Sequence, residues 1–231
     1  MNKPPRRKHS EVMREHLPLK GARVADIGCG DGSLARFMTR EGATVTGIEP
    51  SERQLARARA AEPTGGETYL QGVAEHLPFE DESLDAAVFF NSLHHVPVEG
   101  QARALAEAAR VVRTGGLIYV QEPLAAGPHF ELVRPIEDET VVRAKAEEAI
   151  EATVAAGLLV QDLELVYEAP YKIADFEAFK AGVIAVDEGR RPRFEAMEED
   201  LRTAFEALAE RRDDGYWLFQ PARLNLLRKA P

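Results

Sequence analysis

The 231-residue chain carries 39 acidic and 29 basic side chains, a formal net charge of −10, and 45% of its residues are apolar. No apolar run approaches the roughly 18 residues of a membrane helix, and an acidic surface disfavours extended nucleic-acid binding. The basic cluster Lys3, Arg6, Arg7 and Lys8 is interpreted as a disordered, solubilising terminus rather than a nucleic-acid arm. Cys29, the single cysteine, excludes an internal disulfide and a multi-cysteine zinc site. We expect a soluble, cytoplasmic protein.

Short apolar runs alternate with helical periodicity, which predicts a parallel sheet flanked by helices. An N-terminal extension with an amphipathic start, 1–20, comes first. Strands are expected at 22–27, 44–48, 68–71, 84–90, 117–121, 158–169 and 222–228. Helices are expected from about Ser33, after a capping Ser51, before Thr114-Gly115-Gly116, and over 138–156. The predicted class is α/β, with a doubly wound, mostly parallel, seven-stranded sheet and helices on both faces.

The segment 173–218, which precedes the last predicted strand, is far longer than an ordinary connection. Its apolar residues recur at helical spacing, which predicts an amphipathic helix: Phe194, Met197, Leu201, Phe205 and Leu208. We expect residues 1–231 to form a single domain with 173–218 as a helical insertion. Simple packing onto the sheet and a lid over the active site both remain open for it.

The turn after the first strand reads Asp26-Ile27-Gly28-Cys29-Gly30-Asp31-Gly32, and its glycines allow close approach to a ligand. Glu49 ends the second strand 21 residues after Gly28, where a carboxylate can accept the ribose hydroxyls of an adenosine. A dehydrogenase would read G-x-G-x-x-G, but Ser33 occupies the third glycine position. That class does not require an acidic residue such as Asp26 two positions before the first glycine. The pattern predicts an adenosine site.

Four ordered blocks resemble the class I S-adenosylmethionine (SAM) dependent methyltransferases, in the broad type 11 group that includes ubiquinone and menaquinone biosynthesis methyltransferases. They read VADIGCGDGSLARFM, TGIEPSERQLARAR, QGVAEHLPFEDESLDAAVFFNSLHHV and RVVRTGGLIYVQEP. The resemblance implies a Rossmann-like fold, SAM as cofactor, and methyl transfer to an O, N or C atom of a small molecule.

The resemblance also assigns cofactor-binding residues. It implies that Gly28 and Gly30 lie against the methionine part of SAM, that Asp26 orients its amino group, and that Glu49, beside Pro50, holds the ribose.

In the loop that faces adenine the family reads G-D-A-E-x-L-P, but this chain has Val73 in place of the aspartate. The backbone N–H of Ala74 remains as a donor, and Glu75 is the candidate replacement acceptor. Asn91 matches the position after the fourth strand whose backbone contacts the methionine end of SAM.

His94 and His95 follow the fourth strand and are the candidate general bases, because histidine titrates near neutral pH. Support of the cofactor loop is the alternative role. Glu122 follows the fifth strand as an acceptor contact or a loop anion. Four late side chains are candidates for an acceptor pocket or for core packing: His129, Tyr171, Tyr216 and Trp217.

No metal site is expected, and oligomeric state and acceptor stay open. Two other functions compete with methyl transfer. One is a partner-binding module on a degenerate methyltransferase scaffold, motivated by Val73, and the other is an NAD-dependent oxidoreductase.

Overall fold

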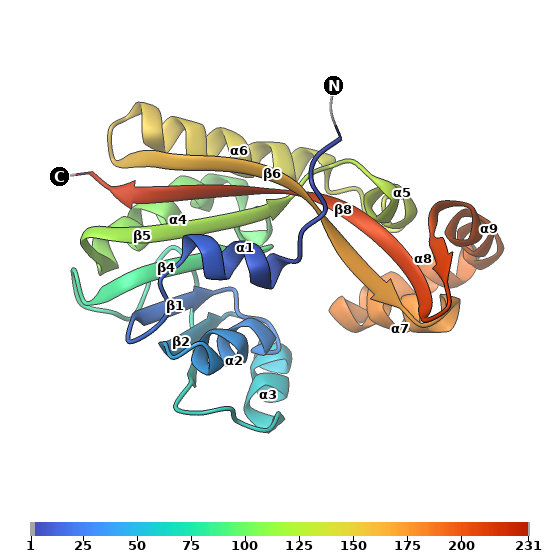
Figure 1. The fold of residues 1–231 in the computed structure, drawn as a ribbon, viewed down its shortest axis with the longest axis horizontal. Coiled ribbons are helices and arrows are strands. Elements are labelled where there is room, and N and C mark those ends of the chain that lie inside the picture. The colour runs from blue at the N-terminus through green and yellow to red at the C-terminus, as the bar shows by residue number, and fades with distance from the viewer. Residues whose placement is uncertain (1–2, 231) are drawn as a thin grey trace. The chain divides into compact units, whose positions relative to one another are not determined.

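The computed structural model describes residues 3–230, whose path is drawn in Figure 1. The helices are α1 (His9–His16), α2 (Ser33–Arg40), α3 (Glu52–Ala60), η1 (Leu93–His95), α4 (Val98–Val111), α5 (Pro128–Val133), α6 (Thr140–Ala155), α7 (Phe176–Val186), η2 (Glu188–Arg190), α8 (Arg191–Ala196) and α9 (Glu198–Leu208). The strands are β1 (Arg23–Ile27), β2 (Thr44–Glu49), β3 (Thr68–Gln71), β4 (Leu84–Phe90), β5 (Val112–Pro123), β6 (Leu159–Ile173), β7 (Glu210–Arg212) and β8 (Gly215–Lys229).

The strands form one sheet in the order β3-β2-β1-β4-β5-β8-β6, and β7 pairs with β8. The pairs β2–β3, β1–β2, β1–β4 and β4–β5 are all parallel, so these five strands end at one common edge. The reversal of strand order between β1 and β4 is the switch point at which doubly wound folds bind ligands. The α/β class is therefore confirmed, with β7 as a short antiparallel addition to the seven predicted strands.

The chain divides into two compact units, and β6 and β8 contribute residues to both. The larger unit holds residues 10–122, 142–165 and those from 223 on, and the smaller holds residues up to 9, 123–141 and 166–222. In the larger unit, alternate residues of β1 face opposite ways, as the two-residue period of a strand requires. Ala25 and Ile27 join a core with α4 and α6, while the Asp26 carboxylate lies near the backbone N–H of Ala35 on α2. Helices thus cover both faces of its sheet (Figure 1).

The smaller unit has a core of its own, built around phenylalanine rings. Phe176, Phe179, Phe194 and Phe205 lie with ring centroids 5.6–6.0 Å apart, and each is at most 5% exposed. They come from α7, α8 and α9, which occupy most of the segment 173–218. The predicted amphipathic helix exists as two helices, because the chain breaks at Met197.

The sequence placed several element boundaries wrongly. The fifth strand was expected at 117–121, after Thr114-Gly115-Gly116, but β5 already begins at Val112 directly after α4 and includes these three residues. Gly116 has no room for a side chain there, since a Cβ would lie 2.7 Å from the Asp85 carbonyl oxygen. The last strand begins at Gly215, seven residues before the predicted Ala222, because β7 extends the pairing of β8.

The basic N-terminal cluster is not free, contrary to the expectation of a disordered terminus. Within the smaller unit, the Arg7 N–H donates to the Glu168 carbonyl and the Glu168 N–H to the Pro5 carbonyl, so this segment pairs with β6. The Arg6 guanidinium binds Glu210 at 2.5 Å and lies 3.5 Å above the centre of the Phe219 ring. Of the helices described, none is both long and apolar enough to cross a bilayer.

Candidate cofactor site and active site

Three predicted cofactor residues of the larger unit, together with Glu122, lie at the edge where the parallel strands end. Gly28 follows β1, Glu49 ends β2, Asn91 follows β4 and Glu122 lies near the end of β5. All four positions flank the switch point between β1 and β4. The topology therefore brings together residues that lie up to 94 positions apart in the sequence.

The glycine turn is shaped by contacts that exclude side chains. Gly28 has φ +74°, and a Cβ there would lie 2.6 Å from the Cβ of Ser92. Gly30, at φ +55°, has no atom within 4 Å of its Cβ position, so its open side can admit a ligand. Cys29 between them is buried, and burial raises the pKa of its thiol far above the ordinary value. Cys29 therefore fills space and is not a nucleophile.

The Glu49 carboxylate joins two loops. Its Oε2 accepts the Gly30 backbone N–H at 2.9 Å and its Oε1 accepts the Ser51 N–H at 2.9 Å. Each carboxylate oxygen can accept a second hydrogen bond, so capacity remains for two hydroxyl donors. Ser51 in turn caps α3 by accepting the Gln54 N–H, and the neighbouring Pro50 carbonyl accepts from Gln71.

Asp26 is an unusual buried acid. It is 1% exposed, and its Oδ2 has no hydrogen-bond partner among the described residues. Burial raises its pKa to about 7, and the nearby carboxylates of Glu49 and Asp31 add to the shift. An orphaned buried carboxylate oxygen is suited to a cationic donor such as the ammonium of SAM.

The loop expected to face adenine lies between β3 and β4. Val73 is 47% exposed, and its carbonyl accepts the His76 N–H at 3.3 Å. Ala74 is buried, and the Glu75 side chain lies against Gly100 on α4, where a Cβ would come within 2.7 Å of Oε1. Glu75 is therefore engaged with α4 through this contact, and the valine offers no side-chain acceptor.

The residues after β4 are held tightly against the glycine turn. Asn91 adopts φ +53°, a conformation that costs energy for a residue with a Cβ and is concentrated at functional sites. Its N–H donates to the Gln121 carbonyl at 2.8 Å, and its side-chain oxygen accepts from the Gln121 amide at 2.8 Å. The Ser92 hydroxyl donates to the Ile27 carbonyl at 2.6 Å, which fixes the loop beside Gly28.

Glu122 organises the histidine segment through three contacts. Its Oε1 accepts the backbone N–H groups of Ser92 at 3.1 Å and Leu93 at 2.9 Å, and its Oε2 lies in hydrogen-bond contact with Nδ1 of His94. His94 is 4% exposed, whereas His95 is exposed. Ser92 was not singled out from the sequence, because its contacts join it to Ile27 and Glu122, which lie far away in the chain.

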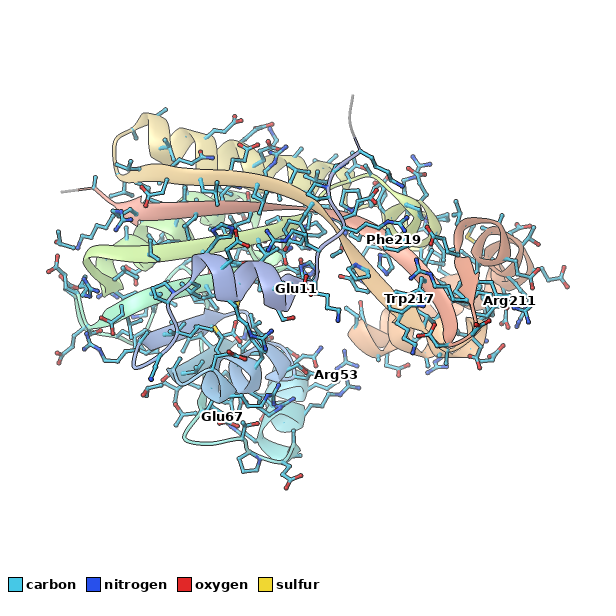
Figure 2. The ribbon with its side chains drawn as sticks, viewed as in Figure 1. Glu11, Arg53, Glu67, Arg211, Trp217 and Phe219 are labelled. Atoms are coloured by element: carbon cyan, nitrogen blue, oxygen red, sulfur yellow. The ribbon has the colours of Figure 1, made fainter. Side chains whose placement is uncertain are left out.

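The late aromatic side chains belong to the smaller unit and have different roles there. Tyr216 packs 5.0 Å from Phe205, centroid to centroid, as part of the core. The Trp217 indole N–H donates to Asp214 at 3.0 Å, and Figure 2 shows Trp217 and Phe219 along β8. His129 and Tyr171 stack at 4.7 Å and are half-buried. All four candidates are partly exposed, so burial alone does not separate a ligand contact from core packing among them.

Sequence comparison finds a likeness for the part of the chain that builds this edge. Residues 25–120 match the family model described as a methyltransferase domain. This part of the chain is therefore similar to methyltransferase domains, and it contains the glycine turn, Glu49 and Asn91.

Among curated relatives, the ubiquinone biosynthesis O-methyltransferase of Alkalilimnicola ehrlichii is 43% identical over 101 residues, which cover 42% of this chain and 40% of that protein. The phthiotriol/phenolphthiotriol dimycocerosates methyltransferase 1 of Mycobacterium ulcerans is 35% identical over 105 residues, 45% of this chain and 38% of that protein. The match to these curated relatives therefore spans about two fifths of their length.

Two solved structures share the fold over almost the whole chain. A proposed methyltransferase from Bacillus halodurans is 19% identical with a TM-score of 0.64, covering 96% of this chain and 98% of that one. The [4+2]-cyclase SpnF is 22% identical with a TM-score of 0.62, covering 96% and 80%. At these identities the likeness establishes the fold alone.

Proposed function

We propose that this protein transfers the methyl group of SAM to an O, N or C atom of a small-molecule acceptor. The observation that carries the proposal is the orphaned Oδ2 of buried Asp26 at the edge where Glu49 braces the glycine turn. Asp26 would receive the ammonium, Glu49 the ribose hydroxyls, and Gly28 and Gly30 would leave room for the chain between them. Bound SAM supplies a methyl carbon that its sulfonium already makes electrophilic, so the protein needs to position the acceptor and remove its proton.

A second set of residues would manage the acceptor's proton. Of the two candidate bases, His95 is exposed and can meet an acceptor, whereas His94 is buried against Glu122. We assign His95 as the base and His94 with Glu122 as positioning residues that hold the segment after β4.

Replacing the base tests that assignment. His95→Gln is expected to lower kcat about 100-fold with an O or N acceptor, the typical loss of a general base. Affinity for S-adenosylhomocysteine should stay unchanged, since the cofactor residues are untouched. An unaltered kcat with the same acceptor would remove His95 from the chemistry.

The function itself is tested by ligand-dependent stability. Saturating S-adenosylhomocysteine is expected to raise the Tm of the purified protein, whereas NAD should not. At a ligand concentration of 100 times Kd, the free energy of unfolding should increase by about 2.7 kcal/mol. A shift with NAD alone would instead identify an oxidoreductase. No shift with either ligand would overturn the enzyme assignment.

The competing proposal is a protein that uses the scaffold for another purpose. It is favoured by exposed Val73 in place of an adenine acceptor, and the fold is shared by a protein described as a [4+2]-cyclase. Tight cofactor binding without transfer to any compound of a broad O, N and C acceptor screen would favour it.

The proposed setting is the cytoplasm, where the buried free thiol of Cys29 stays reduced. The net charge of −10 favours a small-molecule acceptor over nucleic acid.

A further inference from the structure

A cavity of about 480 Å³ opens in the larger unit at the edge opposite the cofactor residues. It is lined by Gly21 and Ala22 before β1, by Asp85 and Ala86 early in β4, and by Gly115 to Leu117 in β5. These positions mark the beginnings of parallel strands, whereas the glycine turn and Glu49 mark their ends. The cavity is therefore separate from the site described above, and its volume suits a small metabolite.

Cationic side chains converge on this cavity from three distant segments. Lys20, Arg113 and Arg228 line it, and Asp85 is its only acidic lining residue. Such a concentration of positive charge is notable on a chain with a net charge of −10. Because low-dielectric walls focus the field of like charges, the cavity favours anions.

Asp85 does not cancel this charge. It accepts the Arg23 N–H at 2.9 Å, the Arg23 side chain at 3.2 Å and the Arg113 side chain at 2.8 Å. The backbone N–H of Arg23, followed by the Arg113 side chain, holds the pKa of Asp85 well below its usual range. The ionised Asp85 carboxylate thus binds the guanidinium groups of both Arg23 and Arg113, so the three groups together carry a net charge of +1.

The remaining cations are also available to a ligand. Arg228 donates to Asp162 at 2.5 Å and to the Gly115 carbonyl at 2.8 Å, but its side chain is 45% exposed and its two terminal nitrogens each carry a second hydrogen that a ligand can accept. The Lys20 ammonium has no ion-pair partner among residues 3–230. Counted with Arg23, the cluster holds two more cations than anions.

We propose that this cavity binds a small organic anion carrying a phosphate group or several carboxylates, held by Lys20, Arg113 and Arg228. Oxyanions accept charge-assisted hydrogen bonds from ammonium and guanidinium groups, and the glycine-lined wall leaves room for the ligand body. The site is independent of the proposed methyl transfer and lies at the opposite edge of the sheet.

Isothermal titration at low ionic strength tests the proposal with two probes, inorganic pyrophosphate for the phosphate class and citrate for the carboxylate class. The wild-type protein should bind at least one probe with one-to-one stoichiometry, and saturating S-adenosylhomocysteine should not displace it. The probe that binds more tightly identifies the chemical class.

Lys20→Glu is expected to weaken probe binding about tenfold or more, while the same charge change at exposed Arg57 on α3 should leave it unaltered. An unchanged Tm for Lys20→Glu shows that the fold is intact. Absence of binding by both probes at millimolar concentration, displacement by S-adenosylhomocysteine, or equal losses in Lys20→Glu and Arg57→Glu would each overturn the proposal.

Discussion

Both compact units have an apolar core, but they differ in where they bury charged side chains. The larger unit places the carboxylates of Asp26, Glu49 and Glu122 at 1–7% exposure along one edge of its sheet. The smaller unit encloses a cluster of phenylalanine rings and keeps most of its ion pairs exposed. Burying a carboxylate costs stability unless hydrogen bonds compensate, whereas burying an aromatic ring stabilises. The larger unit thus combines an apolar core with an edge of buried carboxylates, whereas the core of the smaller unit is built around aromatic rings.

Truncating a ring in the smaller unit should give the largest effect on stability. Phe194 is 0% exposed, and Phe194→Ala is expected to lower the free energy of unfolding by about 3–5 kcal/mol. Chemical denaturation measures the loss, and Val186→Ala, at a residue 49% exposed on α7, should change stability by less than about 0.5 kcal/mol.

The Phe194→Ala variant also tests whether the core of the smaller unit is separate from the cofactor site. If the units divide packing from binding, folded Phe194→Ala should bind S-adenosylhomocysteine with wild-type affinity. A parallel loss of that affinity would mean that the phenylalanine core also builds the cofactor site.

The buried acid predicts a pH dependence of the larger unit. Asp26 has a pKa of about 7 when folded, against about 3.9 in an unfolded chain. Between these two pH values the folded state keeps the proton on Asp26 and the unfolded state loses it. The stabilisation that Asp26 contributes is therefore complete below about pH 4 and is lost as the pH rises to about 7. Comparing denaturation at pH 5 and pH 7, the wild type should lose about 2 kcal/mol more than Asp26→Asn.

Ligand binding should show the reverse dependence for the same group. A cationic ammonium favours ionised Asp26, so affinity for S-adenosylhomocysteine is expected to rise from pH 6 to pH 8 with release of a proton. Titration in buffers of different ionisation enthalpy measures that release, and equal heats in all buffers would remove Asp26 from the ammonium site.

Local sequence patterns predicted the larger unit better than the smaller one. The bounds of β3 and β4 match the prediction residue for residue, because each is a compact apolar or β-rich run between turn residues. The helix break at Met197 and the start of β8 at Gly215 depend on packing and pairing that no short window contains.

The candidate site shows the same division. The glycine turn and Glu49 could be found from a motif, and both lie at the predicted edge of the sheet. The contacts of Glu122 with Ser92, Leu93 and His94 join residues 28–30 positions apart, and no spacing rule encodes them. Glu122 was therefore recognisable as a residue at the edge but not as the one that orients His94.

The most direct test of the cofactor edge is titration of S-adenosylhomocysteine into wild type, Glu49→Gln and Glu52→Gln. Glutamine keeps one acceptor oxygen for the loops but cannot accept hydrogen bonds from both ribose hydroxyls, so Glu49→Gln should bind about tenfold more weakly or worse. Glu52, exposed three residues further on, should be replaceable without loss. Wild-type affinity in Glu49→Gln, or an equal loss in both variants, would contradict the assignment of this edge as the SAM site.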